Sequence, residues 1–599
     1  MLLKIGGLSE LDHSILACVV FIIVIQQSLP ASNLIESGDA SYNSSLNGSK
    51  PLFKKHSWLA LTIAMTCSSL VLAQPSSDAQ TLAETLNALP QACVTSTTHR
   101  LSEQSIQQLQ ILYQTVNYVP MWQDAAQRQQ LLELINDTQY DGLKPQMYQL
   151  QHLAALQQPA SEQQHICDEL LVSHGYLQVL THLRDGVLDS QQVEPYWLEA
   201  AAMQAPITSI IEVAAVGLNN LPQVFADVRP QHSAYQKLRE ILKSSYLLAQ
   251  ADWGEVAVQG KSLRVGMLDP RVPDLRQRLQ LAGYIKDSPE NALTPVENVT
   301  GDIVAVDSLL YTDELSAAVK AFQQDHYLED DGIVGPATLR EMNISPEQRL
   351  LQVRANLERL RWLDQLLEPT MLVVDIAGAR LLYFRDGDIV WRTRTQVGTV
   401  KRQTPLLKSR ITHLTINPTW TVPPTILRED KLPAIRRDLG YLARSNMSVL
   451  DYQGNVLDPS SINWHAPSGI MLRQGPGPSN ALGLVAIRFA NPFSVYLHDT
   501  PSQHLFGRAT RTVSSGCVRV EEAQKLVDQL LFDASEQELE RIALIKASGK
   551  TRNVNLPKPI PVLLAYWTVE VDIDNRLRFR SDSYGHDQKI IRALQAVQR

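Results

Sequence analysis

The stretch Val495-Tyr-Leu-His498-Asp-Thr500, followed by Thr512-Val-Ser-Ser515-Gly516-Cys517-Val-Arg519-Val520, decides how this chain folds and reacts. The apolar residues 493–497 predict a strand that ends at His498, and residues 518–520 predict a short step into a helix beginning near residue 521. A free cysteine, with a pKa of about 8.5, is mostly protonated at neutral pH, and a neighbouring imidazole can take its proton. Cys517 also follows a glycine, and such a turn can aim backbone N–H groups at an oxyanion. The pattern therefore predicts a catalytic pair.

Each of the two residues also has an ordinary structural interpretation. A lone cysteine is usually a small buried hydrophobic residue, and a lone histidine is usually a hydrogen-bonded structural residue. The combination of the two, with the glycine turn, is what favours chemistry.

This stretch resembles the signature of the L,D-transpeptidases, the enzymes with a YkuD-type catalytic domain. The signature has a histidine, a gap of somewhat under twenty residues, Ser/Thr-His-Gly-Cys, an apolar residue, and then Arg or Asn. Ser515 stands where most members carry a second histidine, which leaves His498 as the base. Asp499 stands where many members carry glycine, a mild departure because the family uses the backbone carbonyl there to orient the imidazole. The form Ser-Ser-Gly-Cys resembles the larger periplasmic, LdtD-like branch.

The resemblance implies cysteine acyl transfer without a metal or another cofactor. His498 would deprotonate Cys517, and the N–H groups of Gly516 and Cys517, with the Tyr496 hydroxyl, would hold the oxyanion. In the family, the donor is a peptidoglycan tetrapeptide stem that loses its terminal D-alanine. The acceptor is the side-chain amine of a diaminopimelate residue on another stem. The resemblance also implies inhibition by β-lactams of the carbapenem class, which would acylate the cysteine.

Five further residues are candidates for substrate binding. Arg519, two residues past the cysteine, is placed to meet a substrate carboxylate with two parallel hydrogen bonds, or else to form a salt bridge at the helix entry. The other four candidates are Ser515, Trp420, Arg473 and Asn480.

Length and composition describe a multidomain protein that does not bind nucleic acid. The chain has 599 residues, of which 44% are hydrophobic and 19% charged, with a formal net charge of −8. This length predicts several domains. The mild acidity and the lack of a basic tract argue against nucleic acid as a partner.

Residues 1–73 read as an upstream extension followed by a secretory signal. Lys54-Lys55 precedes an apolar run, Trp58 to Ala73, that ends in a small-residue cleavage pattern. An earlier run at 15–25 is short for a membrane span. We expect the true start to lie near Leu52, with an N-terminal anchor that associates with the membrane as the alternative. The predicted location is the periplasm.

Removal of the signal leaves three cysteines, Cys93, Cys167 and Cys517. An oxidising compartment favours pairing of two thiols within one domain, which predicts a disulfide between Cys93 and Cys167. Apolar neighbours at both positions equally suit two buried free thiols.

Helical periodicity fills two regions before the catalytic stretch. Residues 82–263 predict a helical scaffold domain, with helices at 105–116, 128–136 and 168–184. The runs 118–122 and 141–145 resemble the scaffold domain of the same branch. Residues 268–345 carry two helical faces and a turn, and Phe322-Gln323 with Asp331 to Thr338 resembles the three-helix peptidoglycan-binding module. The alternative is a small bundle that only spaces its neighbours.

Strand periodicity begins after residue 368 and predicts a mostly β catalytic domain over 368–549. Strands at 371–375, 380–384 and 389–397 surround the hairpin turn Asp386-Gly387. Residues 425–470 read as a helical insertion that would cap the site, or as a surface excursion. Residues 550–599 are expected to supply strands that complete the domain. The fold class is multidomain α+β.

Three other functions are alternatives for this chain. A cysteine peptidoglycan endopeptidase of the NlpC/P60 type carries its cysteine before its histidine, the reverse of the order here. A zinc peptidase needs convergent ligands, and His413, His465 and His504 lack that spacing. A non-catalytic wall-binding scaffold predicts an inert Cys517. The acyl acceptor (another stem, a lipoprotein lysine, a free D-amino acid or water) stays open.

Overall fold

The structure is a computed structural model that describes residues 77–597 except 90, 94–100, 158–160, 195–206, 246–252, 286–305 and 573. The chain divides into residues 1–73 and 74–599. The extension, the signal and the early apolar run therefore lie outside the described residues. Within the described ranges, none of the helices combines the length and the apolar character needed to cross a membrane.

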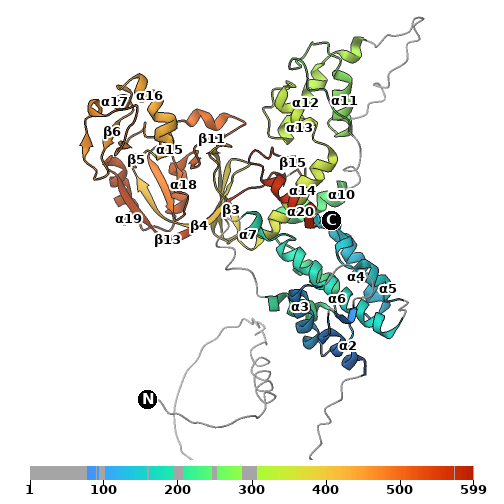
Figure 1. Cartoon of the computed structure of the whole chain (residues 1–599). Helices are drawn as coiled ribbons and strands as arrows, with labels where there is room; N and C mark the ends of the chain where they lie inside the picture. Colours follow the sequence, from blue (N-terminus) through green and yellow to red (C-terminus); the bar gives the residue numbers. More distant parts are fainter. Residues whose placement is uncertain are drawn as a thin grey trace, which may run out of the picture. The chain divides into compact units, whose positions relative to one another are not determined.

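The first region of the described chain is helical, as the apolar periodicity predicts (Figure 1). Its α-helices are α2 (Ser77–Asn87), α3 (Glu103–Thr115), α4 (Ala125–Asp137), α5 (Leu150–Ala155), α6 (Glu162–Asp185), α7 (Ser190–Val193), α8 (Ile207–Gly217), α9 (Leu221–Asp227) and α10 (Ser233–Ser245). Helix α6 is the centre of this region, because most of its side chains are buried and it contacts α2, α3, α5 and α8. Ser161 caps its first turn by accepting from the N–H of Gln164.

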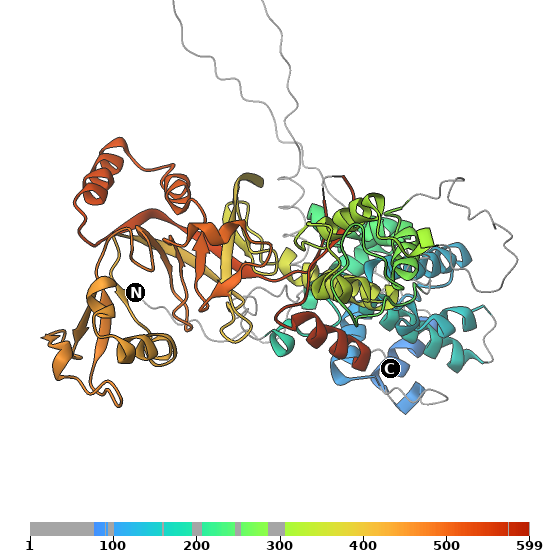
Figure 2. The same cartoon turned by 90° about the horizontal axis from the view of Figure 1, so that it is seen from above.

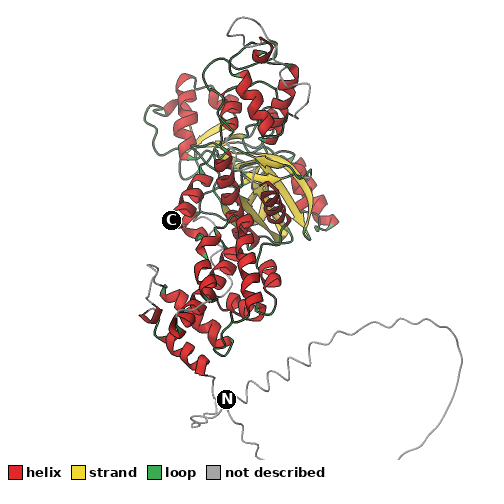
Figure 3. Cartoon of the chain, turned by 90° about the vertical axis from the view of Figure 1, so that its right-hand side faces the viewer, coloured by secondary structure: helices red, strands yellow, loops and turns green. Residues whose placement is uncertain are grey.

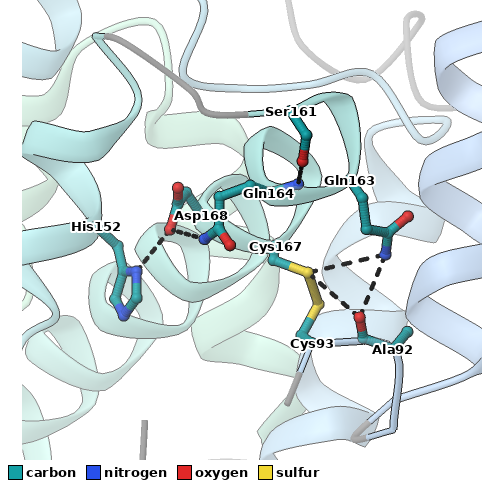
Figure 4. Close-up of a disulfide and its surroundings, with 8 residues drawn as sticks. All are labelled: Ala92, Cys93, His152, Ser161, Gln163, Gln164, Cys167 and Asp168. Atoms are coloured by element: carbon teal, nitrogen blue, oxygen red, sulfur yellow. Dashed lines mark hydrogen bonds and ion pairs between the residues drawn. A yellow bond between two sulfur atoms is a disulfide. The ribbon is translucent and has the colours of Figure 1, made fainter. Parts of the chain in front are cut away.

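A disulfide ties α6 to the short helix η1 (Gln91–Cys93), which confirms the predicted pairing (Figure 4). Cys93 and Cys167 lie with their Cα atoms 5.5 Å apart and are separated by 74 residues. Beside the bond, His152 and Asp168 form a buried pair with 2.6 Å between Nδ1 and Oδ1. The bond thus closes a long loop around an already packed helical core.

A second, smaller helical core follows. Its elements are α11 (Val272–Leu281), η7 (Val306–Leu309), α12 (Asp313–Asp325) and α13 (Pro336–Met342). The predicted faces of α11 and α12 meet in this core, where Leu275, Leu315 and Phe322 are buried. The long helix α14 (Pro346–Asp364) then leads into the sheet domain, and its first turn carries a capping box at Ser345.

The sheet domain contains thirteen strands in two sheets, in the part of the chain from 371 to 565 (Figure 3). They are β1 (Met371–Asp375), β2 (Arg380–Arg385), β3 (Asp388–Gly398), β4 (Leu407–Ile416), β5 (Trp420–Thr421), β6 (Met447–Leu450), β7 (Val456–Leu457), β8 (Met471–Gln474), β9 (Val485–Phe489), β10 (Leu497–His498), β11 (Thr512–Ser514), β12 (Val518–Val520) and β13 (Arg552–Ala565). Its helices and helical turns are α15 (Pro424–Ile426), η8 (Leu427–Lys431), α16 (Leu432–Arg437), α17 (Tyr441–Arg444), η9 (Pro459–Ser461), η10 (Gln503–Gly507), α18 (Ala523–Leu530) and α19 (Glu536–Ala547).

The large sheet closes on itself. Its nine strands follow the order β11-β3-β12-β10-β9-β4-β13-β1-β2, and β2 also pairs with β3. Strand β3 closes the sheet, because its residues 388–394 pair with β2 and its residues 395–396 pair with β12. The short parallel pair β10 and β12 brings the histidine strand beside the cysteine strand.

The insertion differs from the helical segment that the sequence predicts. Residues 420–474 form an α+β lobe (called the insertion below) with its own sheet in the order β5-β8-β6-β7, and it is drawn in orange in Figure 2. Charged helical turns dominate the sequence of this segment, but strands of two to four residues close its core. Such short strands leave too little periodicity to be recognised.

The end of the chain also departs from the expected set of strands. Strand β13 lies inside the large sheet between β4 and β1, whereas β14 (Val569–Val571) and β15 (Leu577–Phe579) form a separate ribbon. A helix, α20 (His586–Val597), follows and packs against α14. Its buried Asp587 is ion-paired with Arg359, which also meets Glu194.

Candidate active site

Strand register gathers five side chains on one face of the large sheet. In the parallel pair, Leu497 lies beside Val518 and His498 beside Arg519, so the register continued by one residue places Tyr496 beside Cys517. Side chains two residues apart along a strand share a face. In the antiparallel pair with β9, Leu497 lies opposite Ile487, which places Arg488 opposite Tyr496. We call this set, Arg488, Tyr496, Cys517, His498 and Arg519, the reactive face.

His498 is held as a neutral base. Its Nδ1–H donates to the backbone carbonyl of Asp499 at 2.5 Å, and because a carbonyl can only accept, the lone pair is left on Nε2. The ring is only 5% exposed. Burial, with a further contribution from the Arg519 charge, lowers the pKa of His498 to about 3. The imidazole is therefore uncharged at neutral pH.

Cys517 is the one free thiol in the described chain, and it is half-buried. Its sulfur lies 4.0 Å from the carbonyl oxygen of Ser494. Burial raises the pKa of the Cys517 thiol, against the lowering effects of hydrogen bonding by Tyr496 and of the charge on Arg488. The resting pair is consequently a neutral thiol and a neutral imidazole, not the thiolate and imidazolium that simple pairing suggests.

The turn before the cysteine is fixed by hydrogen bonds. Gly516 has a φ of 113°, a backbone conformation that favours glycine. Its N–H donates to the Ser514 hydroxyl at 3.2 Å, and its carbonyl accepts from the Thr404 hydroxyl at 2.8 Å. The Gly516 N–H thus already has an acceptor, which differs from the expectation that it points at an oxyanion. Tyr496 lies beside Cys517 in the continued register, and hydrogen bonding by its side chain lowers the pKa of the thiol.

Arg519 carries a charge that meets no carboxylate among the described residues. Its Nη1 donates to Gln396 Oε1 at 3.0 Å, and the Gln396 amide in turn donates to the carbonyl of Ser502 at 3.2 Å. Its Nε is buried without a hydrogen-bond partner in the described structure. The helix-entry salt bridge considered as its alternative role is not formed; Arg394 instead pairs with Glu521 at 2.6 Å.

Three models of known families match this chain. The model of the L,D-transpeptidase catalytic domain matches residues 369–552, which contain the whole reactive face. The chain contains an L,D-transpeptidase catalytic domain. A scaffold domain matches residues 107–242, and the family described as "Putative peptidoglycan binding domain" matches residues 269–342. These matches confirm the predicted multidomain α+β organisation: a helical scaffold, a peptidoglycan-binding domain and a mostly β catalytic domain.

A curated relative and two solved structures are similar to this chain. The "Putative L,D-transpeptidase" of Haemophilus influenzae is 37% identical over 256 residues, which is 42% of this chain and 50% of that protein. The chain therefore spans about half the length of that relative. An L,D-transpeptidase from Mycobacterium smegmatis shares 14% identity, with 33% of this chain and 58% of that chain covered, at a TM-score of 0.16. An L,D-transpeptidase from Xylanimonas cellulosilytica shares 18% identity, with 51% and 98% covered, at a TM-score of 0.14. At these scores the two structures carry no structural argument.

Ser515 connects the turn before Cys517 to the insertion. Arg402 donates to the Ser515 hydroxyl at 3.0 Å through Nη1. The same guanidinium is ion-paired with Asp430 at 2.8 Å and Glu429 at 2.7 Å, both on η8 of the insertion. Hydrogen bonds with Asp430 and Glu429 raise the pKa of Arg402, and hydrogen bonding by Arg402 lowers the pKa of both carboxyls. Tyr496 also packs against the hydrophobic core of the insertion.

The remaining predicted pocket residues lie on or next to the insertion rather than on the reactive face. Trp420 is buried in its core, with the Lys431 ammonium 5.5 Å from the ring centre. Arg473 is exposed and donates to the Thr421 hydroxyl at 3.4 Å. Asn480 is buried and donates to the carbonyl of Gly475 at 2.7 Å while accepting from the N–H of Leu482. Its amide is thus used within its own loop, and its assignment to the substrate pocket stays a prediction.

Three residues at the site were missed from the sequence: Arg488, Arg402 and Thr404. Arg488 lies over the Tyr496 ring, 3.9 Å from its centre. Arg402 and Thr404 reach the site from a loop distant in sequence, whereas Arg488 lies only eight residues before Tyr496, on a strand whose pattern does not mark it. Within the described ranges, no group of three or more His, Cys, Asp or Glu side chains is placed to hold a metal ion.

Proposed function

We propose that the chain is a cysteine L,D-transpeptidase that acylates on a peptidoglycan tetrapeptide stem and joins diaminopimelate residues of two stems. One observation carries the proposal: the strand register that places Cys517 and His498 on one face. The histidine presents the free Nε2 of a neutral ring, because Nδ1 is committed to the Asp499 carbonyl. A neutral acceptor nitrogen beside a thiol is what nucleophilic acyl transfer requires.

The reaction begins with transfer of the thiol proton to His498 Nε2 as the sulfur of Cys517 attacks the amide carbonyl after the third stem residue. The C–N bond then breaks, and the imidazolium returns its proton to the leaving amine of D-alanine. A thioester remains on the sulfur. An incoming amine attacks that thioester, loses its proton to His498 and releases the thiolate, which is reprotonated.

Other residues of the domain assist these steps. The tetrahedral oxyanion accepts hydrogen bonds from the Tyr496 hydroxyl and from the backbone N–H of Cys517. One such donor typically stabilises the transition state by about 3 kcal/mol. Arg519, which has no carboxylate partner among the described residues, binds a carboxylate of the stem. The Asp499 carboxylate has a structural role, since it accepts from the N–H of Leu484 at 2.9 Å and so fixes the loop before β9.

The same chemistry extends to inhibitors and to the other domains. A carbapenem presents a strained amide carbonyl that the thiol can open, leaving an acyl adduct on Cys517. The peptidoglycan-binding domain would keep the catalytic domain on its polymeric substrate. We place the protein in the periplasm, because the run Lys54 to Ala73 has the pattern of a secretory signal and the Cys93–Cys167 bond suits an oxidising compartment.

The test is intact-mass analysis of the purified protein with a disaccharide-tetrapeptide. Wild-type protein should gain the mass of the acyl group, release D-alanine and form a dimeric cross-linked product. Cys517→Ala should form no adduct with the peptide or with a carbapenem, and His498→Ala should lose most turnover. More than a tenth of wild-type turnover in either variant would overturn the assignment of the pair. A wild-type thiol inert to both reagents would favour a non-catalytic scaffold instead.

A further inference from the structure

Arg488 occupies a place in the site that the reaction described above does not use. It lies on β9 opposite Tyr496, which in turn lies beside Cys517, so the three residues form one row across three adjacent strands. The guanidinium carbon is 3.9 Å from the centre of the Tyr496 ring, which is close stacking. The phenol is therefore covered on one face by a planar cation and lies beside Cys517 in the same row.

The charge of Arg488 has no partner of opposite sign within the described chain. Its Nε donates to the Thr415 hydroxyl at 3.4 Å, a long and weak hydrogen bond. Its cross-strand neighbour on the other side is His413, whose pKa is lowered by burial and then by this same charge. A half-buried arginine without a carboxylate costs solvation energy, so its retention beside the phenol needs another benefit.

We propose that Arg488 is a positioning residue that holds the Tyr496 hydroxyl against the reacting centre, so that this hydroxyl donates to the oxyanion formed at Cys517. Stacking fixes the plane of the ring, and the adjacent positive charge strengthens the hydroxyl as a donor. This inference rests on the proposed acyl transfer. In this proposal, Arg488 does not touch the substrate; its charge acts through the Tyr496 hydroxyl to stabilise negative charge on the substrate oxygen.

The two arginines of the reactive face act on different partners. The charge of Arg488 lowers the pKa of Cys517 more than that of Arg519 does, whereas Arg519 lowers the pKa of His498 more than Arg488 does. Their positions explain the difference, because the row of Arg488 contains Cys517 and the row of Arg519 contains His498. Arg488 therefore favours negative charge at the sulfur side, and Arg519 keeps the base neutral.

The experiment is a double-mutant cycle of Arg488→Gln and Tyr496→Phe, measured by single-turnover acylation with a carbapenem and with the tetrapeptide. Each single variant should acylate at least 10-fold more slowly at saturating substrate, with little change in KM. The double variant should be no slower than Tyr496→Phe alone, because the arginine acts only through the hydroxyl. Multiplication of the two losses in the double variant would overturn the proposal.

Two further variants separate positioning from folding. Arg488→Lys keeps the charge but loses the planar stack, so it should recover part of the rate that Arg488→Gln loses. Arg392→Gln removes an exposed arginine from β3, away from the reactive face, and should acylate at the wild-type rate. Unfolding monitored by circular dichroism should be the same within error for the folded variants. An Arg488→Gln enzyme that acylates at the wild-type rate refutes the inference, whereas a wild-type enzyme that forms no adduct refutes the proposed function itself.

Discussion

The acid limb of the pH–rate profile should be missing from the range in which cysteine–histidine pairs usually lose activity. Burial and the Arg519 charge lower the pKa of His498 to about 3. At pH 5 such a base is about 1% protonated, whereas an imidazole with a pKa of 6.5 is about 97% protonated. Acylation at pH 5 should therefore retain nearly all of its pH 7 rate, while an enzyme with an ordinary imidazole would lose about 25-fold.

The assay is kcat/KM for acylation by a carbapenem between pH 4.5 and pH 8.5, with the fold checked by circular dichroism at each pH. Arg519→Gln is the matched control. Removing that charge should raise the pKa of His498 and move the acid limb upward toward the measured range. If kcat/KM of the wild type instead falls tenfold per pH unit below an apparent pKa of 6 to 7, the conclusion that His498 is a buried base that stays neutral is refuted.

Three further predictions concern stability and the insertion. Replacing Cys93 and Cys167 by alanine should lower the free energy of unfolding of the scaffold by about 4 kcal/mol, because the disulfide closes a loop between cysteines 74 residues apart. Acylation of Cys517 should not change, and a loss under about 1 kcal/mol in urea unfolding would contradict this prediction. Arg402→Gln removes exposed ion pairs to the insertion, which contribute little to stability, so KM for the stem should rise about 2- to 10-fold with iodoacetamide labelling unchanged; an equal loss in both would point to a damaged fold. Burial lowers the pKa of His174 to about 4 and that of His182 to about 3, so below about pH 6.5 the unfolded state binds protons that the native state does not. The urea midpoint of the scaffold should therefore fall between pH 7 and pH 5, and a flat midpoint would contradict it.

The sequence was sufficient where local periodicity and turn chemistry act alone. Strands β1, β2 and β3 begin and end within a few residues of their predicted limits, because alternating apolar residues surround the turn Asp386-Gly387, where both residues have positive φ. The pair His498 and Cys517 was recognisable from its resemblance to a family motif instead, because the strand predicted over 493–497 is reduced to the two residues of β10, Leu497–His498. The disulfide could be predicted from compartment and count.

Other parts depend on contacts that no local window contains. Arg488 joins the site only through the register of β9 with β10, and Arg402 only through a loop that meets the insertion. Strand β13 begins at Arg552 and crosses a stretch with three prolines. Prolines argue against a strand interior, yet Pro557 and Pro559 fall within the register shift between Asn555 and Ile560, and Pro561 lies opposite Arg410.

The position of β13 determines which piece of this chain can work alone. The match to the catalytic family ends at residue 552, where β13 begins, although this strand pairs with β4 on one side and β1 on the other. A fragment cut at the limits of that match would keep both reactive residues and lose the middle of its sheet. Two long rows of backbone N–H and C=O groups would then be left as open edges, ready to pair with other molecules. During synthesis, Cys517 likewise precedes the strand on which its sheet depends. The large sheet should therefore close only after β13 has been delivered, and any product that ends before this strand is exposed to aggregation.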